Sequence, residues 1–413
     1  NEITLGNASI NHLRVPGIGV SFSEGGGVVT GIMTASSFKL LDGSAVGGVE
    51  SDAQENTVAG TNAGDSFNGT SAYRNSLFGY EAGGSITTGD YNVCFGGHAG
   101  ANLTTGQRNV YIGAEAGYYS TDAQQNVCIG DDAGKANLTG IYNVCVGRRA
   151  GQKNLQSNNT YIGFEAGILM KNADFNVAVG SKAMNGVTDA DADNNIAIGY
   201  ESLKNISSGD DNIAIGYLSM SNGTVTGNDN TSLGNESMYN ATTAHSNSVV
   251  GYKAGFNLTT GDKNTVLGYQ ALYAGALAEE NVAVGYKANY SVTTGTRNVA
   301  LGYESMLNST DAQYNVAVGY QAGRDVASSS MNVHIGYEAG YDTPGGSNTT
   351  VGARAGKNLT SGSNNIIIGY NAQASTTTTS NEVTIGDTAI TKFRIPGINV
   401  TLKDNGGTPT QGH

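Results

Sequence analysis

The chain has 413 residues, of which 61 are glycine and 13% are charged, whereas about a quarter of the residues of an ordinary globular enzyme are charged. Its formal net charge of −13 argues against nucleic acid or an anionic membrane surface as the main partner, because both are bound by basic faces. No stretch approaches the roughly 20 apolar residues of a membrane-spanning helix, so we expect no membrane insertion.

The two ends of the chain carry related segments. Residues 1–22 read NEITLGNASINHLRVPGIGVSF, and residues 381–403 read NEVTIGDTAITKFRIPGINVTLK. Pro16 and Pro396 lie at matching places, and proline cannot donate a hydrogen bond to a strand ladder. We predict a capping or exit module at 1–22, a glycine-rich connector at 23–52 and a second module at 381–413. The chain lacks an initiator methionine, so we expect translation to begin upstream.

Residues 53–380 are predicted to be a shaft of repeats, of which NVALGYES from Asn298 is typical. Most repeats are 17 residues long, and the others have 16 to 19. A short period of this kind indicates a solenoid. The repeat asparagines are Asn56, Asn75, Asn92, Asn109, Asn126, Asn143, Asn159, Asn176, Asn195, Asn212, Asn230, Asn247, Asn264, Asn281, Asn298, Asn315, Asn332, Asn348, Asn365 and Asn381.

Each repeat can be read in columns, counted from its asparagine. The first five residues are predicted to form a strand, in which columns two and four face one way and column three the other. Column four is large and apolar, so we expect Val299 and Leu301 to fill the coil and Ala300 to face outward. Gly302 in column five implies a positive φ or a close backbone approach, and Ser305 in column eight implies that a second strand lies close to the first.

These columns predict an all-β fold, a parallel β-solenoid in the form of a two-sided β-roll of about 17-residue coils. Nineteen intervals between the asparagines at about 4.8 Å give a rod roughly 90 Å long. The asparagines are expected to form a ladder, in which each amide bonds to the next. The residues expected to hold this architecture are Asn195, Gly199, Asn212, Gly216, Asn298, Gly302, Asn315 and Gly319.

Column three is also apolar or small, as in Ala197, Ala283 and Ile367, so the strand is expected to be buried on both faces. A thin coil cannot cover both faces by itself. Another copy of the chain is the simplest cover, and three copies around a threefold axis would bury column three. We therefore predict a homotrimeric fibre, with His334 of column three near its axis.

Few residues suggest chemistry, and we predict neither an enzyme nor a cofactor. Cys94, Cys128 and Cys145 share column three and are interpreted as small buried residues, with a disulfide or thiolate site as the alternative. The acids of column seven are interpreted as a solvated edge, although paired carboxylates in β-helical proteins can cleave polysaccharides. Ice binding would favour a flat row of threonines, whereas the threonines here cluster in irregular turns.

The turn TDADADN contains the only cation-like cluster, Asp189, Asp191 and Asp193. Alternating carboxylates can converge on Ca²⁺, but this turn lacks the glycine and distal glutamate of a helix-loop-helix calcium site. A flexible acidic turn is therefore favoured over a metal site.

The unit N-V-A-[VI]-G-x-x-[AS], seen at Asn176 and Asn315, resembles the head repeat of trimeric autotransporter adhesins, which implies trimeric β-rolls. The longer form with a T-T-G turn, at Asn92 and Asn247, is similar to repeats in tail fibres of tailed bacteriophages. The end segment NEVTIGDTAITKFRIPG also looks like a phage-fibre segment. The period here is longer than is usual for the adhesins, and neither a coiled-coil stalk nor a membrane barrel is seen. The T-T-G form and the end segment shift the resemblance toward the viral fibre.

These observations predict a structural and adhesive fibre protein, namely a phage tail fibre segment in the virion that presents a host-receptor-binding end. A bacterial trimeric surface adhesin or an extracellular filament subunit is the alternative. Its expected partners are its own copies and a host surface glycan or protein, and binding is expected on the variable outer turns. Candidate surface aromatics for sugars are Tyr91, Tyr118, Tyr119, Tyr142 and Tyr239.

Overall fold

The structure is a computed structural model that describes residues 12–15, 20–23, 26–29, 50–68, 71–395 and 400–403. These residues form strands and turns and contain no helix, and therefore none that could cross a membrane. The chain divides into two compact units, residues 1–49 and 50–413.

The first unit contains an antiparallel sheet of β1 (His12–Val15), β2 (Val20–Ser23) and β3 (Gly26–Val29). Near the other end of the chain, β25 (Lys392–Ile395) and β26 (Val400–Lys403) form an antiparallel hairpin. His12 pairs with Ser23 in one hairpin and Lys392 with Lys403 in the other, so the related end segments share one register. Pro16, Pro396 and residues 30–49 of the expected connector lie outside the described residues.

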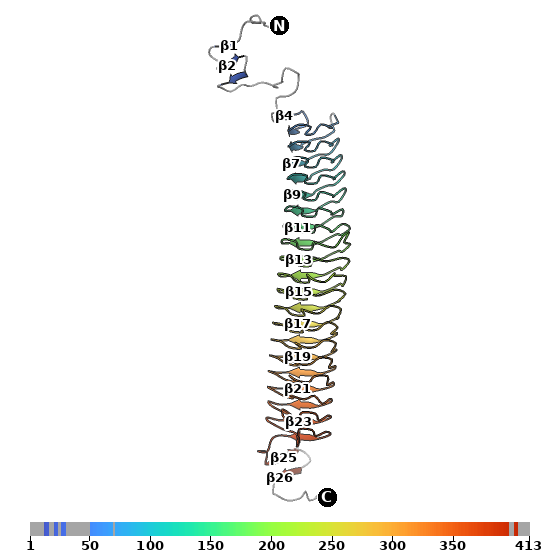
Figure 1. Cartoon of the computed structure of the whole chain (residues 1–413), viewed down its shortest axis with the longest axis vertical. Helices are drawn as coiled ribbons and strands as arrows, with labels where there is room; N and C mark the ends of the chain where they lie inside the picture. The colour runs from blue at the N-terminus through green and yellow to red at the C-terminus, as the bar shows by residue number, and fades with distance from the viewer. Residues whose placement is uncertain are drawn as a thin grey trace. The chain divides into compact units, whose positions relative to one another are not determined.

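The second unit is a solenoid whose strands lie one above another along one side (Figure 1). Neighbouring strands from β5 to β24 pair in parallel and in chain order, and β4 pairs antiparallel with β5. The strands are β4 (Glu50–Ser51), β5 (Thr57–Ala59), β6 (Ser76–Phe78), β7 (Val93–Phe95), β8 (Val110–Ile112), β9 (Val127–Ile129), β10 (Val144–Val146), β11 (Thr160–Ile162), β12 (Val177–Val179), β13 (Ile196–Ile198), β14 (Ile213–Ile215), β15 (Thr231–Leu233), β16 (Ser248–Val250), β17 (Thr265–Leu267), β18 (Val282–Val284), β19 (Val299–Leu301), β20 (Val316–Val318), β21 (Val333–Ile335), β22 (Thr349–Val351), β23 (Ile366–Ile368) and β24 (Val383–Ile385). The predicted all-β parallel solenoid with coils of about 17 residues is confirmed.

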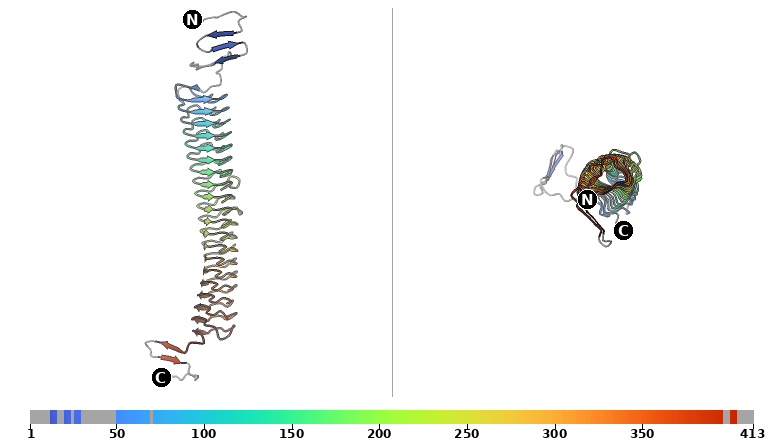
Figure 2. Two further views of the ribbon diagram at one scale, coloured as in Figure 1. Left: turned by 90° about the vertical axis from the view of Figure 1, so that its left-hand side faces the viewer. Right: turned by 90° about the horizontal axis from the view of Figure 1, so that it is seen from below.

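Each of these coils has one three-residue strand, and its other side is made of turns that lie in register from coil to coil (Figure 2). The expected outer strand is represented only by isolated bridges, such as the one between Glu279 and Thr296. Backbone hydrogen bonds nevertheless join neighbouring coils within the turns, for example from Asn308 N–H to the Arg324 carbonyl at 2.9 Å. The turns are therefore held as regularly as the strand, although they lack strand geometry.

The predicted orientation of the strand is wrong, because column three faces the interior of the coil. Ala300 is fully buried, whereas Val299 is half-buried and Leu301 is 44% exposed. The same pattern, with a buried middle residue between two more exposed ones, recurs in β6 to β23. Columns two and four thus form the outer face of the sheet, and column three needs no partner chain to bury it.

The interior is narrow, which explains why the smaller column lies inside. Column three packs against columns nine and twelve of its own coil, as the hydrogen bond of 3.0 Å from Tyr111 to Ser120 Oγ illustrates. A Cβ atom added to Gly117 in column nine would lie 2.6 Å from the Tyr111 ring. In most coils whose column three holds alanine, column nine holds a larger residue, such as Met306 beside Ala300. Ala317 is an exception, because Gly323 in its column nine makes room for the His334 ring of the next coil. The two columns therefore share one limited volume.

His334 lies in this interior and not near an axis between chains. Its ring is fully buried, and Nδ1 lies 2.8 Å from Thr350 Oγ1 of the next coil. Gly340 in column nine leaves room for the ring, because an added Cβ atom would overlap it. Burial lowers the pKa of His334 to about 4, so the imidazole is neutral at neutral pH.

The column-five glycines meet both conditions that the sequence implied. Gly199, Gly216, Gly302 and Gly319 have φ values of +133°, +140°, +145° and +138°. A Cβ atom at each would lie under 3.0 Å from the backbone of the glycine in the next coil. No other residue type satisfies both the positive φ and this approach without displacing a coil.

Columns seven and nine also adopt left-handed backbone conformations, which the sequence did not suggest. In the coil of Asn298, Glu304 has a φ of +51° and Met306 a φ of +50°. Residues other than glycine occupy this region at some cost, because their Cβ atoms crowd the backbone. The inter-coil hydrogen bonds of the turn, including one from Met306 N–H to the Ala322 carbonyl at 3.1 Å, offset that cost.

The asparagines form a continuous buried ladder on the inner side of the strand. Asn298 Nδ2 donates to the Ala312 carbonyl of its own coil at 2.7 Å, and Asn315 N–H donates to Asn298 Oδ1 at 3.0 Å. Asn195 and Asn212 are joined in the same way, at 2.9 Å. Each amide therefore closes its own coil and links it to the next.

The ladder ends one residue later than expected. Glu382, and not Asn381, follows Asn365 in column one, because Glu382 N–H donates to Asn365 Oδ1 at 2.9 Å. Val383 pairs with Ile366 accordingly. The asparagine at 381 belongs to the preceding turn, where its φ is +61°.

Candidate functional site

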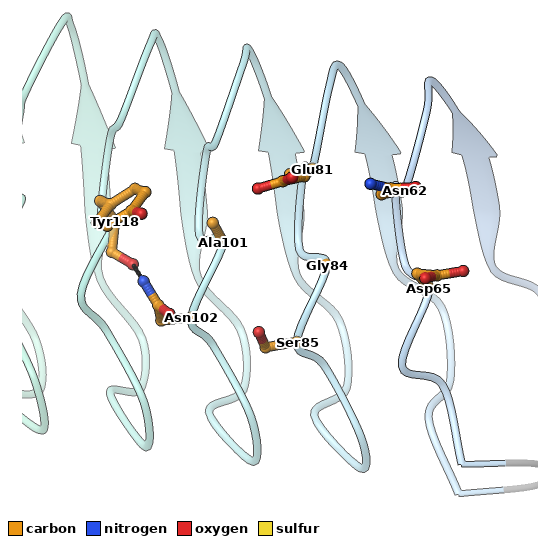
Figure 3. Close-up of a pocket in the computed structure, with 8 residues that line it drawn as sticks. All are labelled: Asn62, Asp65, Glu81, Gly84, Ser85, Ala101, Asn102 and Tyr118. Atoms are coloured by element: carbon orange, nitrogen blue, oxygen red, sulfur yellow. Dashed lines mark hydrogen bonds between the residues drawn. The ribbon is translucent and has the colours of Figure 1, made fainter.

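The outer turns of the first four coils enclose a hollow of about 190 Å³ (Figure 3). It lies on the side of the coil formed by columns seven, ten and eleven, away from the strand. Its lining residues are Asn62, Asp65, Glu81, Gly84, Ser85, Ala101, Asn102 and Tyr118. The repeat scaffold holds these side chains in place, since each comes from a turn that is hydrogen-bonded to its neighbours, as Ser85 N–H is to the Ala101 carbonyl at 3.0 Å.

The hollow exists because column ten changes size along the stack. Asp65 and Tyr118 occupy this column at the two ends of the hollow, and Gly84 and Ala101 occupy it in between. Farther along the solenoid the same column holds a stack of rings with centroids 5.1 Å apart, formed by Tyr239, Phe256, Tyr273 and Tyr290. Two consecutive small residues therefore leave open the space that aromatic rings fill elsewhere.

Tyr118 forms the aromatic wall of the hollow. Tyr119 packs edge-on against its ring with centroids 4.7 Å apart, and His98 does so at 5.8 Å. Lys135 Nζ of the following coil lies 6.0 Å from the ring centroid. In column ten the preceding coil has only Ala101, so Tyr118 borders the hollow beside the part of its ring that His98 of that coil contacts.

The polar groups of the hollow are mainly hydrogen-bond acceptors. Glu81 Oε2 lies 3.2 Å from Nδ1 of His98, and a side-chain hydrogen bond with Glu81 raises the pKa of Tyr80. Asn102 Nδ2 donates to the Tyr118 carbonyl at 2.8 Å. With Asp65 as a second carboxylate and neither lysine nor arginine in its lining, the hollow is acidic. Such a surface accepts hydrogen bonds from hydroxyl groups and repels anions.

The structure brings only part of the predicted aromatic set to this hollow. Tyr118 lines it and Tyr119 packs beside it. Tyr91 and Tyr142 are exposed at the last position of other turns, where Tyr91 OH accepts a hydrogen bond of 2.6 Å from Arg74. Tyr239 is half-buried at the end of the column-ten stack. The five tyrosines therefore do not form one site.

The three aspartates of the acidic turn TDADADN, the weak candidate for Ca²⁺, have different surroundings. Asp189 Oδ1 lies 3.3 Å from Lys171 Nζ, whereas Asp193 Oδ1 accepts a hydrogen bond of 2.8 Å from Asp174 N–H. Burial, opposed by this hydrogen bond, raises the pKa of Asp193. Asp191 donates its backbone N–H to the Ser207 carbonyl. In the part of the chain that the structure describes, no group of three or more His, Cys, Asp or Glu residues could hold a metal ion.

The column-seven acids lie beside cations from neighbouring turns. Glu338 Oε2 lies 3.2 Å from Arg354 Nε and 2.5 Å from Lys357 Nζ, and the hydrogen bond from Lys357 lowers the pKa of this glutamate. Glu201 pairs with Lys204 at 3.0 Å. These carboxylates are engaged in ion pairs along the edge of the solenoid, and the side chains of Glu201 and Glu338 are only 13% and 12% exposed, so this edge is less solvated than the sequence predicts.

The three cysteines are free and buried in column three, as their interpretation as small core residues predicts. Burial raises the pKa of the Cys94 thiol to about 12, and hydrogen bonding with Cys145, together with burial, raises that of Cys128. A thiolate is therefore strongly disfavoured at Cys94 and Cys128 at neutral pH.

Two aromatic stacks on the outer surface, one in column six and the other in column ten, were not predicted from the sequence. In column six, the rings from Tyr252 to Tyr337 stack with centroids 4.8 to 5.3 Å apart. Lys287 of column seven lies 5.4 Å from the Tyr286 ring in this stack and 5.2 Å from Tyr290 in column ten. The signal that could have revealed them is tyrosine at a constant 17-residue spacing, because side chains in one column of a solenoid must lie above one another.

No protein-family model matches this chain, and no curated protein matches it significantly.

Proposed function

We propose that this chain is the shaft of a trimeric extracellular fibre that keeps a receptor-binding end at a distance from the particle or cell that bears it. The resemblance of its repeats favours a phage tail fibre in the virion, and a bacterial surface adhesin or an extracellular filament subunit is the alternative. The observation that carries the proposal is the outer face of the sheet, which is apolar along most of the solenoid.

Column four exposes large side chains on this face. Phe95 is 57% exposed, Leu267 49% and Leu301 44%, and the β-branched residues of column two lie beside them. A continuous apolar face of this kind is typical of surfaces that bind another protein. Burying it would remove a large apolar area from water at about 25 cal/mol per Å².

A second copy of the same chain is the occupant that this face fits. The exposed side chains recur once per coil, at the spacing set by the parallel strands, so a partner must present complementary side chains with the same period over many coils. Another copy of the chain has this period because it has the same repeats. In a threefold arrangement, column two of one copy would meet column four of the next, and the ring of contacts would close.

The experiment is to measure the mass of the full chain in solution by light scattering after size-exclusion chromatography. Three chains per particle are expected for the wild type. Combining Leu267→Lys with Leu301→Lys should yield monomers, because each charge would lie in an apolar interface. Leu277→Lys is the matched control, since Leu277 is 52% exposed on an outer turn and away from the sheet face. A monomeric wild type, or a trimer that the sheet-face substitutions leave intact, would contradict the proposal.

The location of the fibre is tested separately by immunogold labelling. Antibodies against the chain should label the tails of purified phage particles. Labelling of bacterial surfaces in cultures free of phage would instead support the adhesin.

A further inference from the structure

We infer that the hollow beside Tyr118 binds one uncharged pyranose ring of a surface saccharide. The inference deepens the adhesive part of the proposed function and rests on it, because it names the class of partner. It places this contact on the side of the shaft, in the first coils of the solenoid, and not only at a terminal tip.

The hollow combines the two features that a sugar ring requires. The side of Tyr118 that borders it provides an apolar surface on which the C–H groups of a pyranose can pack. The side chain of Asn102 lies beside this surface, and the carboxylates of Glu81 and Asp65 lie farther along the hollow, toward its other end (Figure 3). All three can accept hydrogen bonds from hydroxyl groups. One apolar wall with a few converging polar groups is the usual composition of a small-ligand site.

The size of the hollow suits a single ring. Its volume of about 190 Å³ is below the roughly 300 to 1,000 Å³ of sites for drug-sized ligands. At about 30 Å³ per water molecule in the liquid, it corresponds to about six waters. A sugar that displaces them replaces their hydrogen bonds with its own hydroxyl groups, so the exchange need not leave the carboxylates unpaired.

The charge of the hollow selects against acidic sugars. Asp65 and Glu81 contribute two carboxylates. Lys135, which lies beside Tyr118, does not neutralise them, because it is ion-paired with Glu115 and Asp132. A sialic or uronic acid would bring a third negative charge to this surface. The lining therefore favours a neutral hexose over an anionic one.

The aromatic stacks elsewhere on the shaft do not offer the same surface. The Tyr273 ring lies between Phe256 and Tyr290, with centroids 5.1 Å away on each side. Its two faces are covered, and only its edge is available to a ligand. Tyr118 differs because Ala101 occupies the corresponding position in the preceding coil.

The test is saturation-transfer NMR on the full chain with the methyl glycosides of glucose, galactose and mannose, and with N-acetylneuraminic acid as the anionic probe. Ala101→Tyr should extend the column-ten stack over Tyr118 and fill the hollow while retaining every polar group. Tyr118→Ala removes the wall. Tyr273→Ala is the control, because it removes a tyrosine of the same column whose faces are covered. Circular dichroism of each variant establishes that it is folded.

At least one neutral glycoside is expected to receive saturation from the wild type and from Tyr273→Ala. Its signal should fall at least tenfold with Ala101→Tyr and Tyr118→Ala. The inference is overturned if no neutral glycoside binds, if binding survives Ala101→Tyr, or if only the anionic sugar binds. Light scattering on the same samples separates the two proposals, since a trimer without sugar binding contradicts only the hollow, and a monomer that binds sugar contradicts only the trimeric shaft.

Discussion

Asn281 Oδ1 accepts two hydrogen bonds from Asn298, one from its backbone N–H at 3.0 Å and one from its side-chain Nδ2 at 3.1 Å. Both asparagines are fully buried. Because neighbouring coils repeat this relationship along most of the stack, the spacing between coils is set by side chains as well as by the backbone. A buried amide side chain whose donor and acceptor atoms are all hydrogen-bonded is costly to replace, because its partners would remain buried with neither a protein group nor water to bond.

Asn298→Ala is expected to lower the free energy of unfolding by about 3 kcal/mol, because it leaves Asn315 N–H and the Ala312 carbonyl without their partner. Native-state hydrogen exchange should show faster exchange of the Asn315 amide and of its neighbouring coils. Asn222→Ala is the control, because Asn222 also donates to an asparagine of the next coil, Asn240, but at the exposed surface. Equal effects of the two substitutions would show that burial of the ladder is unimportant.

Gly96 and Gly97 provide a matched pair of adjacent glycines. Gly96 has a φ of +138°, and a Cβ atom there would lie 2.5 Å from the Gly113 carbonyl oxygen, whereas Gly97 has open space. Gly96→Ala is expected to cost at least about 3 kcal/mol, while Gly97→Ala should be neutral or stabilising by about 0.5 kcal/mol. Urea denaturation monitored by circular dichroism measures both.

The same argument applies to the centre of the shaft. Gly302→Val and Gly319→Val should each disrupt the local stack, which electron microscopy would show as a break or bend in the rod. An unchanged rod would refute the explanation offered for column five.

Ala300→Tyr should destabilise the shaft by about 1 to 3 kcal/mol, because the ring would overlap Met306. Combining it with Met306→Gly should recover part of this loss, since the pair would then match Tyr111 and Gly117, although Asn289 of the preceding coil stands where Gly100 makes room for Tyr111. Ser309 would also be placed to accept the tyrosine hydroxyl, as Ser120 does for Tyr111. A double-mutant cycle should give a favourable coupling of at least about 1 kcal/mol, and additivity would contradict a shared volume.

Acid should weaken the shaft through His334. Its folded-state pKa of about 4 lies below the usual value of 6.5, so the unfolded chain binds the proton more tightly. The stability associated with the neutral ring is therefore present above pH 6.5 and is lost as pH falls from 6.5 to 4, by about 3 kcal/mol. His334→Tyr, which imitates Tyr111, should abolish this part of the pH dependence, and His98→Gln at the surface should retain it. Urea unfolding at pH 7 and pH 4.5 measures the difference.

Several features of the fold were predictable because they depend on the chain alone. A period of 17 residues requires identical positions to stack, so the solenoid, the parallel strand and the asparagine ladder follow from the spacing of Asn281, Asn298 and Asn315. The glycine in column five could be predicted for the same reason, since one residue type that recurs at one place reports a backbone constraint.

The candidate site was less predictable. The sequence indicates Tyr118 as a surface aromatic, but it does not connect Asp65, Glu81 and Ala101 with this residue. They come from three earlier coils and meet only because their turns are aligned. The relevant signal was an absence of large residues at Gly84 and Ala101, which becomes visible only when the turns are arranged in columns.

The sequence by itself determined the period, the strand and the alternation of its faces, because these depend on local geometry and on repetition. Only the tertiary structure decided which face is inside. Strand alternation places Ala300 on one face and Val299 and Leu301 on the other, but it does not say which of the two faces lies inside the coil. The prediction that the larger side chains fill the interior was wrong. The cross-section of the coil decides the matter: left-handed residues at Glu304 and Met306 fold the turn back close to the strand, which leaves room for Ala300 and excludes Leu301.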